Sequence, residues 1–118
     1  MSGRKNCCLA KKALCSANGL AWAFRNEKAF RNETAALLFA LALAIYMGAA
    51  AASVLRVFLA CLLPMITELV NTAAEAALDL LAGPIYREEV KAAKDMLSAA
   101  VLLSLIVGYG YSLLVIFF

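Results

Sequence analysis

The chain has 118 residues, of which 65% are hydrophobic, and its mean hydropathy is +0.86. A soluble domain of this size buries only about two-thirds of its surface, so it cannot hide this many apolar side chains. Composition therefore excludes an ordinary soluble domain and favours an all-α polytopic membrane protein that forms one domain over residues 1–118.

The net charge of +3 is modest, but the positive residues are unevenly placed. Seven of the eleven Lys and Arg side chains precede the first apolar run, which begins near residue 34. Because Lys and Arg are enriched in cytoplasmic segments of membrane proteins, we expect the N-terminus in the cytoplasm. A membrane surface beside these charges explains them better than nucleic acid does, and no nucleic-acid partner is expected.

Residues 4–25 are expected to form an amphipathic helix on the membrane surface. One face of this helix, opposite polar positions, carries five apolar side chains: Leu9, Ala13, Ala17, Leu20 and Phe24. Trp22 lies off this face, where an indole suits the headgroup layer. Gly19 weakens the helix by about 1 kcal/mol, which allows a break there.

The first span is expected at residues 34–52, which carry no charge and can cross a bilayer. The polar segment 26–33 stands just before it. Small residues from Gly48 onwards favour a short turn and close packing between neighbouring helices.

The second span, residues 54–81, becomes polar before it ends. Its uncharged part, residues 57–67, is only about 17 Å long. With Arg56 reaching the outer surface, Glu68 is expected near the cytoplasmic edge of the hydrocarbon. Pro64, one turn before Glu68, favours a local kink.

One face of this second helix carries a row of polar side chains at helical spacing. Its members fall within a sector of about 100°: Glu68, Asn71, Thr72, Glu75 and Asp79. Ionisable groups next to a membrane segment are costly unless they are paired or used. The row is therefore interpreted as a site for a cation or a proton, with a solvated helix face as the simpler alternative.

Gly83 and Pro84 are expected to end the second helix. A charged loop follows, and residues 96–118 are again free of charge, which predicts a third span with the C-terminus outside. Three transmembrane helices and one surface helix make up the expected fold, and no repeat or linker divides the chain.

The side chains available for chemistry are carboxylates, lysine and an amide. There is no histidine, and the four cysteines form no Cys-x-x-Cys pair, so neither zinc nor a disulfide is expected. Carboxylates suit Mg²⁺ bound together with phosphates, and a further carboxylate can act as general base in phosphoryl transfer. The same groups would suit a small proton or cation transporter, and composition does not distinguish the two.

Three polar motifs resemble those of the small bacterial integral-membrane diacylglycerol kinases, over residues 19–105. They are residues 26–33 (NEKAFRNE), residues 68–75 (ELVNTAAE) with Asp79, and residues 93–101 (AKDMLSAAV). The resemblance implies a homotrimer in the bacterial inner membrane, with active sites shared between subunits, that transfers phosphate from ATP with Mg²⁺ to diacylglycerol. Undecaprenol is the alternative lipid, because related small kinases act on it.

The same resemblance implies a role for each matching residue. Glu68 is the expected catalytic base, and Asn71 would orient the base or the phosphate. The expected Mg²⁺ ligands are Glu27 and Glu75. The expected nucleotide contacts in the loop and third helix are Tyr86, Arg87, Lys94 and Asp95. The expected lipid site, beside Glu68, consists of Ala29, Phe30, Arg31, Asn32, Glu33 and Ser98.

The chain departs from the family pattern at the nucleotide contacts. The family usually has an arginine and a tyrosine in the surface helix, where this chain has Cys8 and Cys15. The family's loop usually reads Glu-Tyr-His, whereas this chain has Ile85, Tyr86 and Arg87. An altered nucleotide preference, or an inactive protein that keeps the fold, is therefore a further alternative.

Overall fold

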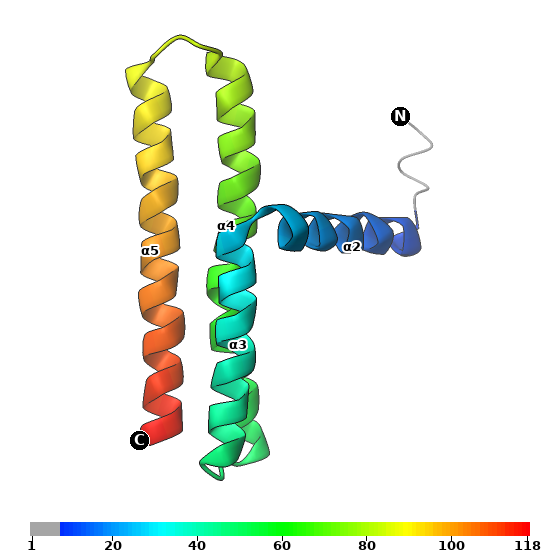
Figure 1. The fold of residues 1–118 in the computed structure, drawn as a ribbon, viewed down its shortest axis with the longest axis vertical. Coiled ribbons are helices and arrows are strands. Elements are labelled where there is room, and N and C mark those ends of the chain that lie inside the picture. Colours follow the sequence, from blue (N-terminus) through cyan, green and yellow to red (C-terminus); the bar gives the residue numbers. More distant parts are fainter. Residues whose placement is uncertain (1–7) are drawn as a thin grey trace.

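The computed structural model describes residues 8–118, which form four α-helices and no strand (Figure 1). The helices are α2 (Leu9–Asn26), α3 (Lys28–Tyr46), α4 (Ala51–Ala82) and α5 (Glu88–Phe117). The prediction of an all-α chain is confirmed. The expected start of the surface helix at residue 4 and the thiol of Cys7 lie outside the described residues.

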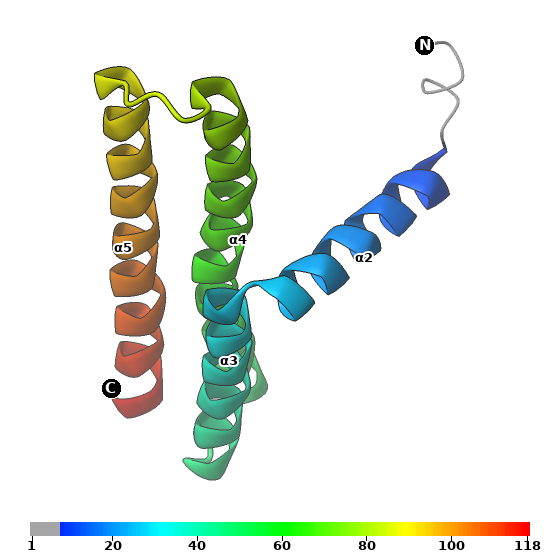
Figure 2. The ribbon, with the colours of Figure 1, turned by 45° about the horizontal axis from the view of Figure 1, so that its top comes forward.

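Three helices run side by side while α2 projects away from them (Figures 1 and 2). The central helix is α4, which packs along both α3 and α5. Each of these three helices is long and apolar enough to cross a membrane, as predicted. The 32 residues of α4 span about 48 Å, well beyond a hydrocarbon layer of about 30 Å. Figure 1 shows α4 and α5 continuing past the level of α2 towards the loop that joins them.

A single residue, Glu27, separates α2 from α3. Its extended backbone (φ −113°, ψ 112°) breaks the helix, and its N–H donates to the carbonyl of Ala23 at 2.8 Å. The Arg31 guanidinium donates to the carbonyls of Phe24 and Arg25 at 2.9 and 3.0 Å, so it supplies partners for the last turn of α2. The helix does not break at Gly19, and the change of direction occurs at Glu27 instead.

Two of the helices begin earlier than the uncharged segments of the sequence suggest. Helix α3 starts at Lys28 rather than residue 34, and α5 starts at Glu88 rather than residue 96. Lys, Arg and Glu are good helix formers, and Glu88 and Glu89 in the first turn of α5 complement the helix dipole. Absence of charge therefore marks the apolar part of each helix and not the helix itself.

Two glycines with positive φ define the turns. Gly48 (φ 79°) lies in the turn between α3, which ends at Tyr46, and α4, which begins at Ala51. The first helix therefore ends before residue 52, where the first span was expected to end. Gly83 (φ 60°) caps α4, and its N–H donates to the carbonyl of Asp79 at 3.0 Å. Both turns lie where the glycines predict them.

Helices α4 and α5 meet along a seam of small and weakly polar side chains. The seam consists of Cys61, Pro64 and Thr67 on α4 and Ser104, Gly108 and Ser112 on α5. Pro64 has no N–H for the carbonyl of Ala60. A Cβ on Gly108 would lie 2.5 Å from that carbonyl oxygen and 2.9 Å from Pro64 Cδ, so only glycine permits this approach.

Hydroxyl groups satisfy one another across the same seam. The hydroxyls of Thr67 and Ser104 are 2.6 Å apart, and Cys61 Sγ lies 3.3 Å from Ser112 Oγ. Thr67 Oγ1 also lies 2.9 Å from the carbonyl of Pro64, to which it can donate. The seam is therefore closely packed and internally hydrogen-bonded, and it fixes α5 against α4 below the polar row.

Candidate functional site

The polar row of α4 forms one wall of a cleft of about 330 Å³. Trp22 of α2 and Glu27 of the α2–α3 joint form the opposite wall. We call this space the carboxylate cleft; its lining from α4 is Glu68, Asn71, Thr72, Glu75, Ala76 and Asp79. The sharp exit of α2 at Glu27 brings that carboxylate to α4, although it is distant from the α4 row in sequence.

Glu68 is the most enclosed carboxylate of the α4 row, with only 8% of its surface exposed. Glu27 and Glu75 line the same cleft. In residues 8–118 no group of three or more Asp, Glu, Cys or His side chains is close enough to form a metal site alone. A cation at this site would therefore complete its coordination with other oxygen ligands, such as an amide oxygen, water or phosphate.

Asn71 holds one of the predicted metal ligands in place. Its Nδ2 donates to Glu75 Oε1 at 2.8 Å, which is the i,i+4 spacing that brings side chains together on a helix. The Oδ1 atom of Asn71 is buried and has no hydrogen-bond partner within the described chain. Buried acceptors are normally satisfied, so this oxygen is free to meet a ligand.

A second groove, of about 300 Å³, lies on the α5 side of the same carboxylates. Glu68, Asn71 and Glu75 line it from α4, and Ser98 lies at its polar end. The rest of this α5 groove is apolar: Val101, Leu102 and Leu105. Glu68 therefore lines both the carboxylate cleft and a groove whose α5 side is largely apolar.

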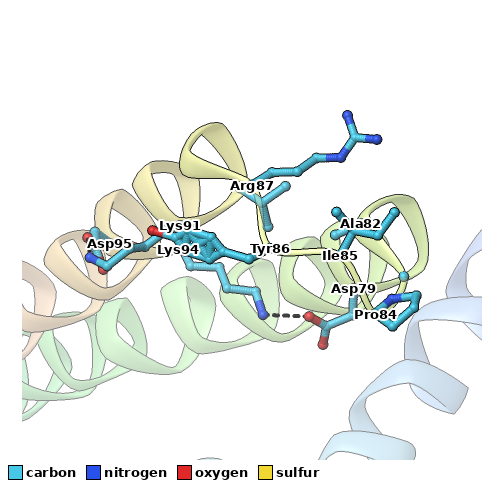
Figure 3. Close-up of a pocket in the computed structure, with 11 residues that line it drawn as sticks. Asp79, Ala82, Pro84, Ile85, Tyr86, Arg87, Lys91, Lys94 and Asp95 are labelled. Atoms are coloured by element: carbon cyan, nitrogen blue, oxygen red, sulfur yellow. Dashed lines mark hydrogen bonds and ion pairs between the residues drawn. The ribbon is translucent and has the colours of Figure 1, made fainter.

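A third space, the loop pocket, lies where α4 and α5 join and has a volume of about 410 Å³ (Figure 3). Asp79, Tyr86 and Lys94 are among its lining residues. Lys94 Nζ donates to Asp79 Oδ1 at 2.5 Å, whereas Asp95 pairs with Lys91 of its own helix at 2.8 Å. Arg87 also lines the pocket, but in Figure 3 its guanidinium points away from the Lys94–Asp79 pair.

The residues predicted for the lipid site do not share one environment. Phe30 and Glu33 are buried, with 4% and 7% of their surface exposed, and Glu33 Oε1 has no hydrogen-bond partner in the described chain. Ala29, Arg31 and Asn32 are exposed on the first turns of α3. Arg31 has a structural task, because it caps α2.

Three residues that line these cavities had no individual role predicted for them, although two of them belong to the polar row. Trp22 was expected in the headgroup layer, yet it lines the carboxylate cleft. Thr72 and Asp79 line the same cleft, and Asp79 also lines the loop pocket. The spacing of the polar row already contained both of these α4 residues; only the position of Trp22 required the fold.

Comparison with known proteins gives a consistent result. The profile of the family described as Prokaryotic diacylglycerol kinase matches residues 14–116. A protein of Escherichia coli (strain K12) named Diacylglycerol kinase is 40% identical over 100 residues, which cover 85% of this chain and 81% of the relative. A protein of the same name from Helicobacter pylori is 37% identical over 98 residues, which cover 83% of this chain and 76% of the relative. Another, from Haemophilus influenzae, is 36% identical over 94 residues, which cover 79% of this chain and 79% of the relative. The carboxylate row, the three long apolar helices and these matches lead to one conclusion: the chain belongs to the prokaryotic diacylglycerol kinase family.

Proposed function

We propose that this protein phosphorylates diacylglycerol to phosphatidic acid at the membrane surface, with ATP as phosphate donor. The single observation that carries the proposal is the position of Glu68, a nearly buried carboxylate that lines both the carboxylate cleft and the α5 groove, whose far side is apolar. A lipid alcohol needs an apolar path for its chains and a base for its hydroxyl, and the two meet at this residue.

Glu68 is the general base in this scheme. Its carboxylate accepts the proton of the lipid hydroxyl, while the hydroxyl oxygen forms a bond to the γ-phosphorus of ATP. The bond from that phosphorus to the bridging oxygen of ADP breaks, and ADP leaves with the electron pair. Positioning and charge neutralisation supply most of the rate in such transfers, so few further catalytic groups are required.

Glu27 and Glu75 would hold Mg²⁺, and they suit that ion because hard cations prefer carboxylate oxygens. The bond from Asn71 fixes Glu75, and the unpartnered Asn71 Oδ1 leaves an acceptor beside it. When bound, the ion supplies positive charge that offsets the charge of the phosphates. Asn71 thus orients the metal ligand Glu75 and offers its own Oδ1 as an acceptor in the same site.

The nucleotide is proposed to bind from the loop pocket, through Tyr86, Lys94 and Asp95, with Arg87 as a further phosphate contact. Lysine ammonium groups suit phosphate oxygens as compact point charges. The loop that lines this pocket joins α4 and α5 beyond the level of α2 in Figure 1. That position gives a water-soluble nucleotide access from the aqueous side.

The lipid is proposed to lie near Ser98 and the start of α3, with Ala29, Phe30, Arg31, Asn32 and Glu33. Ser98 is exposed at the polar end of the α5 groove. A serine hydroxyl there can donate to or accept from the glycerol oxygens of the lipid.

The protein is proposed to act as a homotrimer in the bacterial inner membrane, with its N-terminus in the cytoplasm and its C-terminus outside. Lys94 pairs with Asp79, which lies about 16 Å beyond Glu68 along α4. A group so far along the helix is poorly placed to serve Glu68 of its own chain. A neighbouring subunit that supplies Lys94 to Glu68 would complete the site, which is why we propose sites shared between subunits.

A transfer assay tests the proposed function. The purified protein in mixed micelles would receive radiolabelled ATP with either dioleoylglycerol or undecaprenol, with and without Mg²⁺. We expect Mg²⁺-dependent labelling of phosphatidic acid. Labelling of undecaprenyl phosphate alone would assign the other lipid, and the absence of lipid labelling with both substrates would contradict a kinase.

A further inference from the structure

The ion pair between Lys94 and Asp79 joins α5 to α4 near the loop (Figure 3). Lys94 Nζ lies 2.5 Å from Asp79 Oδ1. The other ion pair in residues 8–118, Lys91 with Asp95, lies within α5. In the described chain, Lys94 and Asp79 thus form the one ion pair between two different helices.

Neither partner has an oppositely charged residue one turn away on its own helix. The positions one turn away from Lys94 on α5 are Val90, Lys91, Leu97 and Ser98, and none is acidic. On α4, the positions one turn away from Asp79 are Glu75, Ala76, Ala82 and Gly83, and none is basic. Asp95, next to Lys94, does find an intrahelical partner in Lys91. Neither residue therefore has a competing ion-pair partner one turn away on its own helix, and the two pair with each other.

Asp79 occupies a boundary between two cavities. It lines the carboxylate cleft together with Glu68 and Glu75, and it lines the loop pocket together with Lys94. The bond to Asp79 therefore holds the ammonium group of Lys94 in the loop pocket, beside the one residue that lines both cavities.

The contribution of this pair to folding does not explain its placement. The Lys94 and Asp79 side chains are 37% and 64% exposed, and exposed ion pairs add little to stability because water and salt screen them. An unrestrained lysine would, however, lose much side-chain freedom on binding a phosphate. Ordering the side chain in advance removes part of that loss.

We infer that Asp79 is a positioning residue that holds Lys94 at the boundary of the two cavities, ready for the phosphates of the nucleotide. An ammonium group has three N–H donors, so one bond to Asp79 leaves two for phosphate oxygens. The inference rests on the proposed function, because it takes the nucleotide as the ligand of Lys94. Both partners belong to one chain, so the pair does not depend on which subunit supplies Glu68.

The test is a double-mutant cycle of Asp79→Ala and Lys94→Met, in which nucleotide affinity is measured by displacement of fluorescent trinitrophenyl-ATP. Asp79→Ala in the parent should weaken MgATP binding about fivefold, the upper range for an exposed ion pair. The same substitution beside Lys94→Met should change affinity less than about twofold, because Asp79 then has no lysine to position. Asp79→Glu, which keeps the carboxylate, should restore most of the affinity.

Kinetics supply a second readout and a control. Asp79→Ala should raise the KM for MgATP and leave the KM for diacylglycerol unchanged. Glu89→Ala, which removes an exposed carboxylate outside the three cavities, should behave as the parent does. An equal loss of affinity in both backgrounds, an unchanged affinity in Asp79→Ala, or no nucleotide binding by the parent would each overturn the inference. A parent that binds nucleotide and shows the cycle but labels no lipid would instead contradict the proposed function alone.

Discussion

The same two helices, α4 and α5, behave differently in their two halves. In the half that holds the seam, Gly108 lets the backbones approach and hydroxyl groups bond across the contact. In the half that carries the polar row, the carboxylate cleft and the α5 groove lie on the two sides of α4, and the loop pocket lies at its end. Close packing is thus concentrated in one half, and the cavities lined by charged side chains lie in the other.

Residues in the two halves affect different free energies: the free energy of folding in the seam, and the free energy of ligand binding in the polar half. A buried contact in the seam acts on stability, because neighbouring atoms cannot move apart to admit added volume. An exposed charge in the polar half contributes at most about 1 kcal/mol to folding and can act on a ligand instead. Substitutions in the two halves should therefore change different measurements.

The largest expected effect is the loss of activity in Glu68→Gln. An amide cannot accept the proton of the lipid hydroxyl, so phosphate transfer should fall about 100-fold or more. Transfer of radiolabelled phosphate in mixed micelles measures the rate, and thermal unfolding in the same detergent checks that the variant is folded. A folded Glu68→Gln protein that keeps a tenth or more of the parent rate would exclude Glu68 as the base, whereas Glu89→Gln should leave the rate unchanged.

A smaller effect is expected for the two proposed metal ligands. Glu27→Gln and Glu75→Gln each remove one charged oxygen ligand, so each should shift the Mg²⁺ dependence of transfer about tenfold towards higher metal. Titration of activity with Mg²⁺ at saturating ATP measures the shift, and high metal should restore part of the rate. Titration curves identical to that of the parent would show that these carboxylates are not ligands.

The smallest change, Gly108→Ala, tests the other half of the comparison. The added methyl group would lie 2.5 Å from the Ala60 carbonyl oxygen, and such overpacking costs about 1–3 kcal/mol. Gly110→Ala is the matched control, because a Cβ there meets nothing within 4 Å and alanine favours a helix. Gly108→Ala should lower the thermal midpoint while Gly110→Ala should not. Equal midpoints would mean that the seam is not closely packed.

The turns and the polar row could be predicted from the sequence because they depend on local chemistry. Gly48 and Gly83 supply positive φ, and the α4 row follows from helical spacing within one segment. The starts of α3 and α5 could not be found from charge-free runs, because a charged helix continues past the membrane boundary.

The meeting of distant segments was the harder part of the site to predict. Trp22 reaches the cleft because the chain turns at Glu27, and no periodicity within one helix contains that information. The Lys94–Asp79 pair depends likewise on the register of α5 against α4, which the contact of Gly108 with Pro64 sets. The family resemblance identified Lys94, but its partner required the packed structure.

Mixing inactive subunits tests most directly the central claim that the α4 row forms a lipid-kinase site completed by a second subunit. Glu68→Gln and Lys94→Leu chains, each inactive alone, would be co-assembled in equal amounts after mild denaturation, with subunit exchange verified. If Glu68 and Lys94 of a working site come from different chains, random mixing leaves both intact in about one quarter of the sites. The account therefore predicts recovery of about a quarter of the parent rate of diacylglycerol phosphorylation. Mixed assemblies that remain as inactive as the separate variants would contradict it.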